Sequence, residues 1–219
     1  MKIAILVYPG MTALDAVGPY EVLAQLRGAE VSFVGRRQGL VTCDTGALKL
    51  LAEKSIDEVP LADVVLVPGG PGDERVRADE RLLSWLRAMH AGSRWTASVC
   101  TGSLILGAAG VLEGLEATTH WLRLDALAEY GAKPVAARFV EAGKVITAAG
   151  VSAGIDMALH LAAREAGERV AQAIQLSLEY DPQPPFASGS PDKAPEALVE
   201  AVGGAFDGIM AERMAKLGS

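Results

Sequence analysis

Short apolar runs recur along the chain between stretches in which hydrophobic residues have helical spacing. The run Val64-Val-Leu-Val67 contains no polar position, which is typical of a strand covered on both faces. The predicted strands are residues 3–8, 31–34, 64–67, 95–99 and 145–148, and the predicted helices are residues 16–26, 80–91, 101–111, 121–130, 153–166 and 169–178. This alternation predicts an α/β fold: a doubly wound, mostly parallel sheet with helices on both faces, in a flavodoxin-like sandwich.

The end of the chain has a different pattern. Residues 181–195 contain five prolines, which exclude a helix or an interior strand and predict an extended, proline-rich strap. Residues 196–217 have helical patterning and are expected to dock on the domain or on a second subunit. Alternation around residues 48–51 and 138–140 indicates small hairpins. No internal repeat or composition break divides the chain, so we expect one domain over residues 1–219.

Composition narrows the classes of function. The formal net charge of −7, without a local basic patch, disfavours binding to nucleic acid. No apolar run approaches the ~20 residues that span a bilayer, and the apolar start is too short for a signal-peptide core. The cysteines, Cys43 and Cys100, form no CxxC pair, which disfavours a disulfide framework and a zinc site. We therefore expect a cytoplasmic protein without a membrane partner.

The segment Trp95-Thr-Ala-Ser-Val-Cys-Thr-Gly-Ser103 runs from a predicted buried strand directly into a helix, with Cys100 at the junction. A tight turn at such a junction pushes one side chain out of the sheet edge, as in a nucleophile elbow. The partial positive charge at the helix N-terminus favours a thiolate, which predicts a lowered pKa for Cys100. The alternative is a buried structural thiol.

A second predicted strand ends in Pro68-Gly-Gly-Pro-Gly72 at the same edge of the sheet. This turn can supply backbone N–H groups as hydrogen-bond donors. The N–H groups of Gly70 and Thr101 are candidates for stabilising an anion opposite Cys100. A nucleotide-phosphate loop is disfavoured because the Gly-Lys-Ser/Thr ending is missing. The charged residues 73–81 are interpreted as a solvated loop and helix face.

Asp15 follows the first predicted strand and opens the first helix, so it is also expected at the carboxyl edge of the sheet. It has two compatible roles. As an N-cap it would accept backbone hydrogen bonds, and as a neighbour of Cys100 it would act as general acid and base, because a carboxyl beside a thiolate tends to hold its proton.

None of the imidazoles, His90, His120 and His160, adjoins Cys100, so a cysteine–histidine dyad is unsupported. His90 and His160 lie within helical patterns and are expected to be structural. Two roles remain open for His120, which either lines the pocket or caps the following helix. Cys43 has no visible partner and is expected to be inert.

Four motifs together resemble the ThiJ/PfpI superfamily, which is related to class I glutamine amidotransferases. They are Leu14-Asp-Ala-Val-Gly-Pro19, Pro68-Gly-Gly70, Ser98-Val-Cys-Thr-Gly-Ser103 and Thr118-Thr-His-Trp121. The resemblance implies the fold of that superfamily. Within the superfamily, the segments Gly150 to Asp156 and Pro184 to Pro191 are similar to those of the isonitrile (isocyanide) hydratases. Proteases and glyoxalases of the superfamily typically carry His after the cysteine, where this chain has Thr101.

The resemblance implies an enzyme that hydrates R–N≡C to an N-substituted formamide through a covalent Cys100 thioimidate, with Asp15 transferring protons and Thr101 orienting the reacting groups. It also implies a homodimer and a small-molecule substrate. No cofactor or metal is expected, because the substrate carbon is itself electrophilic enough for a thiolate. The expected contacts with substrate or its developing anion involve Gly69, Gly70, Thr101, His120 and Val151. Two departures from the family pattern, Pro71 and Val151-Ser152, bear on substrate fit.

Two other classes of protein remain as alternatives. Regulators of the AraC type carry an N-terminal ligand-sensing domain with similar Cys-Thr-Gly and Thr-Thr-His-Trp stretches, but no basic helix-turn-helix pattern follows the domain in this sequence. A redox or stress-response protein would instead use Cys100 as an oxidisable thiol beside a carboxylate.

Overall fold

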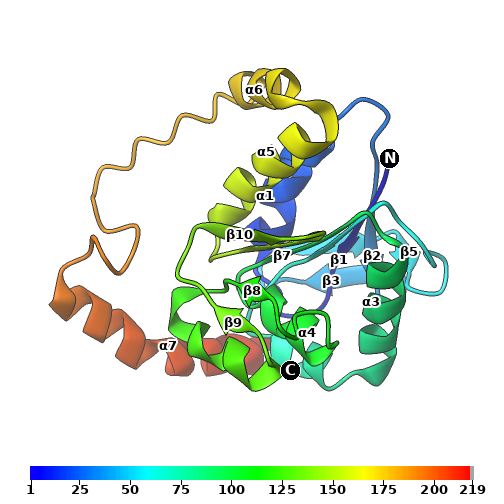
Figure 1. Cartoon of the computed structure of the whole chain (residues 1–219). Coiled ribbons are helices and arrows are strands. Elements are labelled where there is room, and N and C mark those ends of the chain that lie inside the picture. Colours follow the sequence, from blue (N-terminus) through cyan, green and yellow to red (C-terminus); the bar gives the residue numbers. More distant parts are fainter. Residues whose placement is uncertain (218–219) are drawn as a thin grey trace.

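A seven-stranded sheet forms the centre of the molecule (Figure 1), as seen in a computed structural model that describes residues 1–217. Its strand order is β10 (Phe139–Ala142), β11 (Val145–Ala148), β7 (Trp95–Val99), β6 (Val64–Val67), β1 (Lys2–Leu6), β2 (Glu30–Gly35) and β5 (Lys54–Ser55). All neighbours pair in parallel except β10, which is antiparallel to β11. The central strands β6 and β7 are buried along their whole length, because helices cover both faces.

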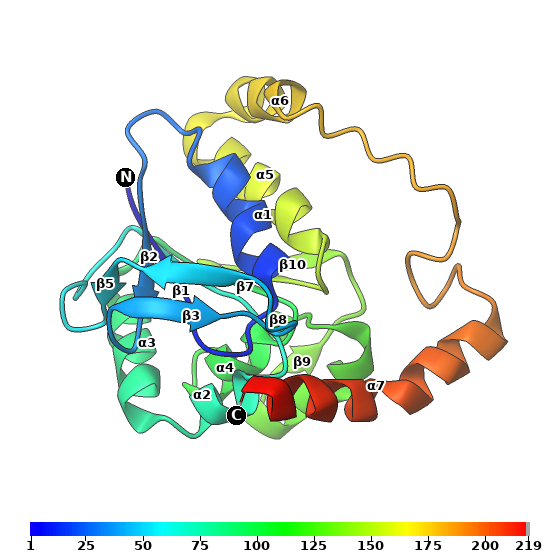
Figure 2. The same cartoon turned by 180° about the vertical axis from the view of Figure 1, so that it is seen from behind.

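The helices lie in two layers, one on each face of the sheet (Figures 1 and 2). One layer contains α1 (Ala13–Leu23) and α5 (Ala153–Ala166), which pack on each other, followed by α6 (Glu168–Ser177). The other contains α2 (Asp73–Arg77), α3 (Glu80–Gly92) and α4 (Gly102–Ala108). The predicted doubly wound, mostly parallel sandwich is confirmed. Successive strands are added on one side of β1 first and then, from β6 onward, on its other side. Ligands of such sheets bind beside this reversal point, at the carboxyl ends of the strands.

Small elements complete the sandwich. The strands β3 (Gly39–Thr42) and β4 (Lys49–Ala52) form an antiparallel hairpin, while β8 (Glu116–Ala117) and β9 (Lys133–Pro134) form a short parallel pair. The predicted helix over residues 121–130 was wrong, since the structure has two 3₁₀ segments there, η1 (Trp121–Arg123) and η2 (Asp125–Tyr130). Only Leu127 of this segment is buried, so there is no continuous apolar stripe to hold an α-helix against the body.

The chain after α6 leaves the body in an extended, mostly exposed segment and returns as α7 (Glu196–Leu217) (Figures 1 and 2). This helix lies along the edge of the sandwich near α2 and β9 (Figure 2). None of its described side chains is fully buried. Residues 218 and 219, which the predicted domain includes, lie outside the described part of the chain.

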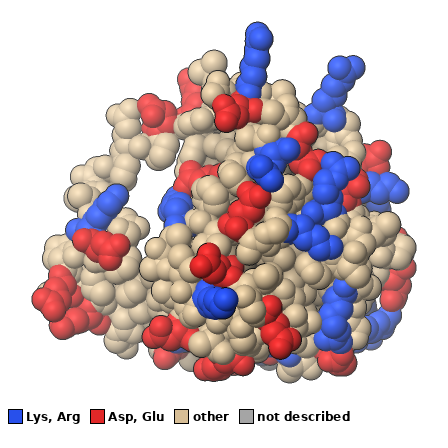
Figure 3. Space-filling model, in the orientation of Figure 1, with Lys and Arg blue, Asp and Glu red and all other residues tan. Residues whose placement is uncertain are grey.

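Two surface properties bear on the sequence-based expectations. Lys and Arg are interspersed with Asp and Glu on the face shown in Figure 3, without one large patch of a single sign. Within residues 1–217, no helix combines the length and the apolar character that a membrane crossing requires.

Candidate active site

Cys100 occupies a strained turn between β7 and α4. Its φ of 56° lies in the left-handed region, which is uncommon for a residue with a side chain. The backbone N–H donates to the carbonyl oxygens of Ala148 and Ala149, at 3.1 and 3.2 Å. The carbonyl accepts hydrogen bonds from the hydroxyls of Thr119 (2.9 Å) and Ser103 (3.2 Å). These bonds hold the strand-to-helix turn that the sequence predicts.

Glycines let the turn approach its neighbours closely. A Cβ on Gly102 would lie 2.1 Å from the carbonyl oxygen of Val67, and a Cβ on Gly69 would lie 2.4 Å from the backbone nitrogen of Thr101. Neither distance is sterically possible. The start of α4 therefore packs directly against the end of β6, which brings Cys100 beside the glycine turn.

Asp15 lies in the first turn of α1 and is completely buried. Thr12, not Asp15, occupies the N-cap position, so the N-cap interpretation of Asp15 was wrong. Its Oδ2 accepts a hydrogen bond of 3.0 Å from the backbone N–H of Gly69. Oδ1 is buried without a hydrogen-bond partner in the described structure. The carboxyl interacts with the Cys100 thiol, so the two side chains that the sequence nominated are brought together.

The backbone N–H groups of Gly69 and Gly70 do not have the role that the sequence suggested. Gly70 lines the cavity in front of Cys100, but its N–H donates to the Thr101 hydroxyl at 3.0 Å. Gly69 does not belong to the cavity lining and donates its N–H to Asp15. Both amides therefore position the reacting side chains and are not free to bind an anion. The Thr101 backbone N–H does interact with Cys100, where it favours the thiolate.

The cavity in front of Cys100 has a volume of about 400 Å³. Cys100 is 6% exposed and lies in its wall, so the thiol is reachable although mostly buried. His120 and Val151 also line it, as expected from the resemblance. The opposite wall comes from α7 through Phe206, Met210 and Arg213.

The family model for the DJ-1/PfpI family matches residues 1–164. The chain belongs to the DJ-1/PfpI family. It is 46% identical over 200 residues to isonitrile hydratase of Pseudomonas putida, covering 91% of this chain and 87% of that protein. It is 33% identical over 177 residues to the HTH-type transcriptional regulator GbdR of Pseudomonas aeruginosa, covering 76% of this chain but 46% of the regulator.

The fold also matches a solved structure closely. The crystal structure of a ThiJ/PfpI family protein from Pseudomonas syringae superposes with a TM-score of 0.92 at 39% identity, covering all of this chain and 90% of that one. The resemblance to the ThiJ/PfpI superfamily is thereby confirmed.

Burial dominates the titration of the two central groups in this DJ-1/PfpI site. It raises the pKa of Asp15 to about 8, partly offset by the Gly69 N–H and by Cys100. It also raises the pKa of Cys100 well above its usual value, and the negative charge of Asp15 adds to this effect. The expected low thiol pKa was therefore wrong for this state, because α4 has only seven residues and its dipole does not outweigh desolvation.

Protonation of Asp15 removes one of the effects that raise the pKa of Cys100. A protonated Asp15 carries no charge, so it removes the repulsion that opposes the thiolate. The Thr101 N–H then favours the anion on sulfur. Desolvation still opposes the thiolate, so the thiolate is the minor form of Cys100; with the proton on the carboxyl, this form suits nucleophilic attack followed by proton delivery.

His120 combines its two predicted roles. Its Nδ1 accepts a hydrogen bond of 3.3 Å from the backbone N–H of Leu122, which caps η1, and its ring lines the cavity. Burial and the nearby Arg123 lower its pKa, so the ring is neutral at pH 7. The other histidines form side-chain hydrogen bonds away from the cavity: His90 with Thr96, and His160 with Glu141.

Several groups at the cavity were not found from the sequence. Asp73 is buried in its wall and pairs with Arg77 at 3.0 Å, and Arg77 donates to the Tyr130 hydroxyl at 2.9 Å. The interpretation of residues 73–81 as a solvated face was wrong for Asp73, because α2 turns it toward Cys100. Arg213 pairs with the buried Asp44. No sequence signal links residues so distant, although the apolar spacing of residues 196–217 indicated a docking helix.

Within the described residues, no group of three or more His, Cys, Asp or Glu side chains is arranged to hold a metal ion. Cys43 is buried and unpaired.

Proposed function

We propose that this protein is an isonitrile hydratase, an enzyme that adds water to R–N≡C and releases an N-substituted formamide. The observation that carries the proposal is a reachable cysteine on a strained turn beside a buried carboxyl that holds its proton near neutral pH. The identity to the Pseudomonas putida isonitrile hydratase extends over most of both chains and gives independent support.

In the first step, the Cys100 thiolate forms a bond to the terminal carbon of the isocyanide. Asp15 donates its proton to the same carbon, which gives the covalent thioimidate Cys100–S–CH=N–R and leaves Asp15 as a carboxylate. The raised pKa of Asp15 supplies this proton at neutral pH. The Thr101 N–H stabilises the sulfur anion before attack and again when sulfur leaves.

In the second step, the Asp15 carboxylate accepts a proton from water as the hydroxyl adds to the thioimidate carbon, and it passes this proton to the nitrogen, which leaves Asp15 as a carboxylate again. The tetrahedral adduct Cys100–S–CH(OH)–NH–R then collapses. The C–S bond breaks, the hydroxyl proton passes to Asp15, and H–CO–NH–R is released with the thiolate and the protonated carboxyl restored. No cofactor enters these steps, because the terminal carbon accepts the thiolate and the proton directly.

Gly69 and Gly70 support this chemistry indirectly. Gly69 holds Oδ2 of Asp15, which leaves Oδ1 as the oxygen free to exchange a proton. Gly70 fixes the Thr101 side chain and so the direction of the adjacent N–H. His120 and Val151 are proposed to contact the substrate as part of the cavity wall.

We further propose a cytoplasmic homodimer that acts on a small molecule and binds no nucleic acid or membrane. Two buried, unpaired cysteines fit a reducing compartment. Large apolar side chains remain exposed in the single chain, as expected for surfaces that a second copy covers. They include Leu40 (70% exposed) and Leu51 (53%) on the hairpin and Leu176 (78%) on α6. Light scattering on the purified protein tests the dimer.

The decisive experiment is turnover. The purified protein is incubated with an isocyanide, and the N-substituted formamide is measured by mass spectrometry in ¹⁸O-labelled water. We expect labelled formamide from the wild type and none from Cys100→Ala. Asp15→Asn is expected to lower kcat by about 10²- to 10⁴-fold. Asp181→Asn, on the exposed strap, is the matched control and should retain full activity.

The absence of formamide from the wild type would reject the proposal, as would full activity in Cys100→Ala. The ligand-sensing or redox alternative would then be favoured. The similarity to the regulator covers less than half of that protein, which gives the ligand-sensing alternative less support.

A further inference from the structure

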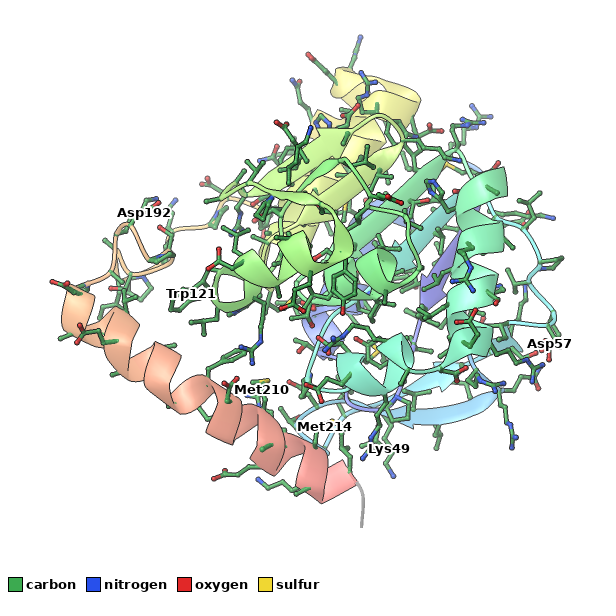
Figure 4. All side chains as sticks on the ribbon, turned by 60° about the horizontal axis from the view of Figure 1, so that its bottom comes forward. Lys49, Asp57, Trp121, Asp192, Met210 and Met214 are labelled. Atoms are coloured by element: carbon green, nitrogen blue, oxygen red, sulfur yellow. The ribbon has the colours of Figure 1, made fainter. Side chains whose placement is uncertain are left out.

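The helix α7 closes the cavity on the side opposite the α/β body. Phe206 and Met210 line the cavity wall, and Arg213 lies one turn further along the helix. In Figure 4, Met210 and Met214 lie on the side of α7 that is turned toward the body. Met214 reaches the first loop of the body, since a Cβ on Gly10 would lie 2.9 Å from its Sδ.

The aromatic side chain on this helix is firmly placed. The ring of Phe206 stacks on the ring of His120, with centroids 5.1 Å apart and an interplanar angle of 19°. The guanidinium carbon of Arg123 lies 5.1 Å from the centroid of the same ring. Arg123 also forms an ion pair with Asp207, the next residue on α7. These contacts fix the position of the Phe206 ring in the cavity wall.

Both polar and apolar residues line the cavity. Thr12, Gly70 and Thr101 belong to the lining with Cys100, and the apolar side chains of Leu104, Ala126, Phe206 and Met210 also contribute to it. The R–N≡C group is linear, so a substrate whose carbon contacts Sγ projects its substituent away from the sulfur. The substituent must therefore lie in the part of the cavity remote from the sulfur.

The arginines around the cavity are already paired. Each arginine in its wall has an acidic partner: Arg77 pairs with Asp73, Arg123 with Asp207, and Arg213 with Asp44. An anionic substituent would have to compete with these acidic partners and lose its hydration. The carboxylates of Glu74 and Glu129 in the lining would also repel it. The lining therefore favours a neutral substituent over an anionic one.

We propose that Phe206 and Met210 of α7 bind the organic substituent of the substrate and select for neutral aromatic isocyanides. This inference rests on the proposed hydratase function and names its substrate class. The groups that form and break bonds belong to the body, whereas the selecting side chains belong to a helix joined to it through the exposed strap. Substitutions on α7 should therefore change which isocyanide is preferred and leave the chemical step intact.

The test compares phenyl isocyanide, methyl isocyanide and isocyanoacetate as substrates of the wild type, Phe206→Ala and Ile209→Ala. Ile209 lies on the same helix, is 43% exposed and does not line the cavity, so its variant is the matched control. We expect the wild type to prefer phenyl isocyanide and to use isocyanoacetate poorly. Phe206→Ala should lower kcat/KM for phenyl isocyanide about tenfold, mainly through KM, and change it less than about threefold for methyl isocyanide.

A second measurement does not require turnover. The rate of Cys100 alkylation is measured with iodoacetanilide and with iodoacetamide, each relative to its rate with a free thiol. The wild type and Ile209→Ala should favour the aromatic reagent, and Phe206→Ala should lose this preference. An equal loss of kcat/KM for phenyl and methyl isocyanide in Phe206→Ala, or an unchanged alkylation preference in that variant, would overturn the inference. A wild type that hydrates no isocyanide but retains the aromatic alkylation preference would overturn the hydratase proposal and leave the aromatic subsite supported.

Discussion

Arg213, near the end of α7, forms an ion pair of 2.5 Å with Asp44, a carboxylate that is buried in the turn between β3 and β4. The same carboxylate accepts a hydrogen bond from Thr12 at 3.4 Å, and its charge contributes to the raised pKa of Asp15. The pair thus connects the position of the C-terminal helix with the electrostatics of the active site.

We expect Arg213→Ala to lower the free energy of unfolding by about 1–2 kcal/mol, because it leaves a buried carboxylate unpaired while the arginine itself is partly exposed. Asp44→Asn should be tolerated better, and the double variant should recover part of the loss. Urea denaturation of all four proteins gives the coupling energy. A coupling near zero would show that the ion pair contributes nothing to docking α7.

Asp15→Asn should lower the pH at which the Cys100 thiol ionises, because the negative charge of Asp15 is, after burial, the largest cause of its raised pKa. The rate of alkylation by iodoacetamide as a function of pH measures this midpoint. Asp73→Asn provides the matched comparison, since Asp73 acts in the same direction but more weakly. A midpoint that stays unchanged in Asp15→Asn would contradict the coupling between the two groups.

The pKa of Asp15 also makes stability depend on pH. In the folded protein the carboxyl keeps its proton up to about pH 8, whereas in the unfolded chain it ionises near the ordinary aspartate pKa of 3.8. The unfolded state therefore binds fewer protons between these values, and stability falls as pH rises through this window. An asparagine at this position does not titrate.

The stability of Asp15→Asn relative to wild type should consequently increase from pH 5 to pH 8, by at most ~1.4 kcal/mol per pH unit. Chemical denaturation at several pH values measures the difference. A constant difference across the window would mean that the buried carboxyl does not hold its proton.

Thr101→Val should cost about 1–3 kcal/mol of stability, because the Gly70 N–H would lose its acceptor inside the protein. Thr101→Ser retains the hydroxyl and should cost clearly less. Thermal and urea denaturation compare the two variants. Equal losses would assign the effect to packing of the methyl group and not to the hydrogen bond.

Gly102→Ala should destabilise the protein by about 1–3 kcal/mol or prevent folding, because its Cβ would lie 2.1 Å from the Val67 carbonyl oxygen. Gly204→Ala, on α7, is the control: a Cβ there meets no atom within 4 Å. Alanine is the better helix former, so this variant should be neutral or more stable by about 0.5–1 kcal/mol. Similar losses in both variants would refute the close-packing argument.

Much of the fold followed from local patterns. Apolar runs such as Val64–Val67 become buried strands because only a sheet covered on both faces hides them completely. The predicted helix over residues 121–130 was wrong for the opposite reason. Its pattern was compatible with a helix, but too few of its side chains are buried to stabilise one. Gly131, with a φ of 72°, ends the segment.

Some features of the candidate site could likewise be predicted from the sequence, and others could not. Cys100 was identified because it directly follows a strand, and Asp15 because it opens the helix after the first strand; the carboxyl ends of parallel strands share one edge of the sheet. The roles of Gly69 and Gly70 were misjudged, since the direction of a backbone N–H depends on which side chain packs against it. No local pattern reports that Thr101 and Asp15 take up these two amides.

The sequence by itself determined the order of strands and helices, the turn that carries Cys100 and the presence of a carboxyl at the same edge, because these depend on short-range periodicity and on steric limits. Only the tertiary structure decided the protonation of the Cys100–Asp15 pair and the second wall of the cavity. Protonation depends on desolvation by residues from many elements. The wall depends on where α7 docks after a strap whose sequence does not encode its direction.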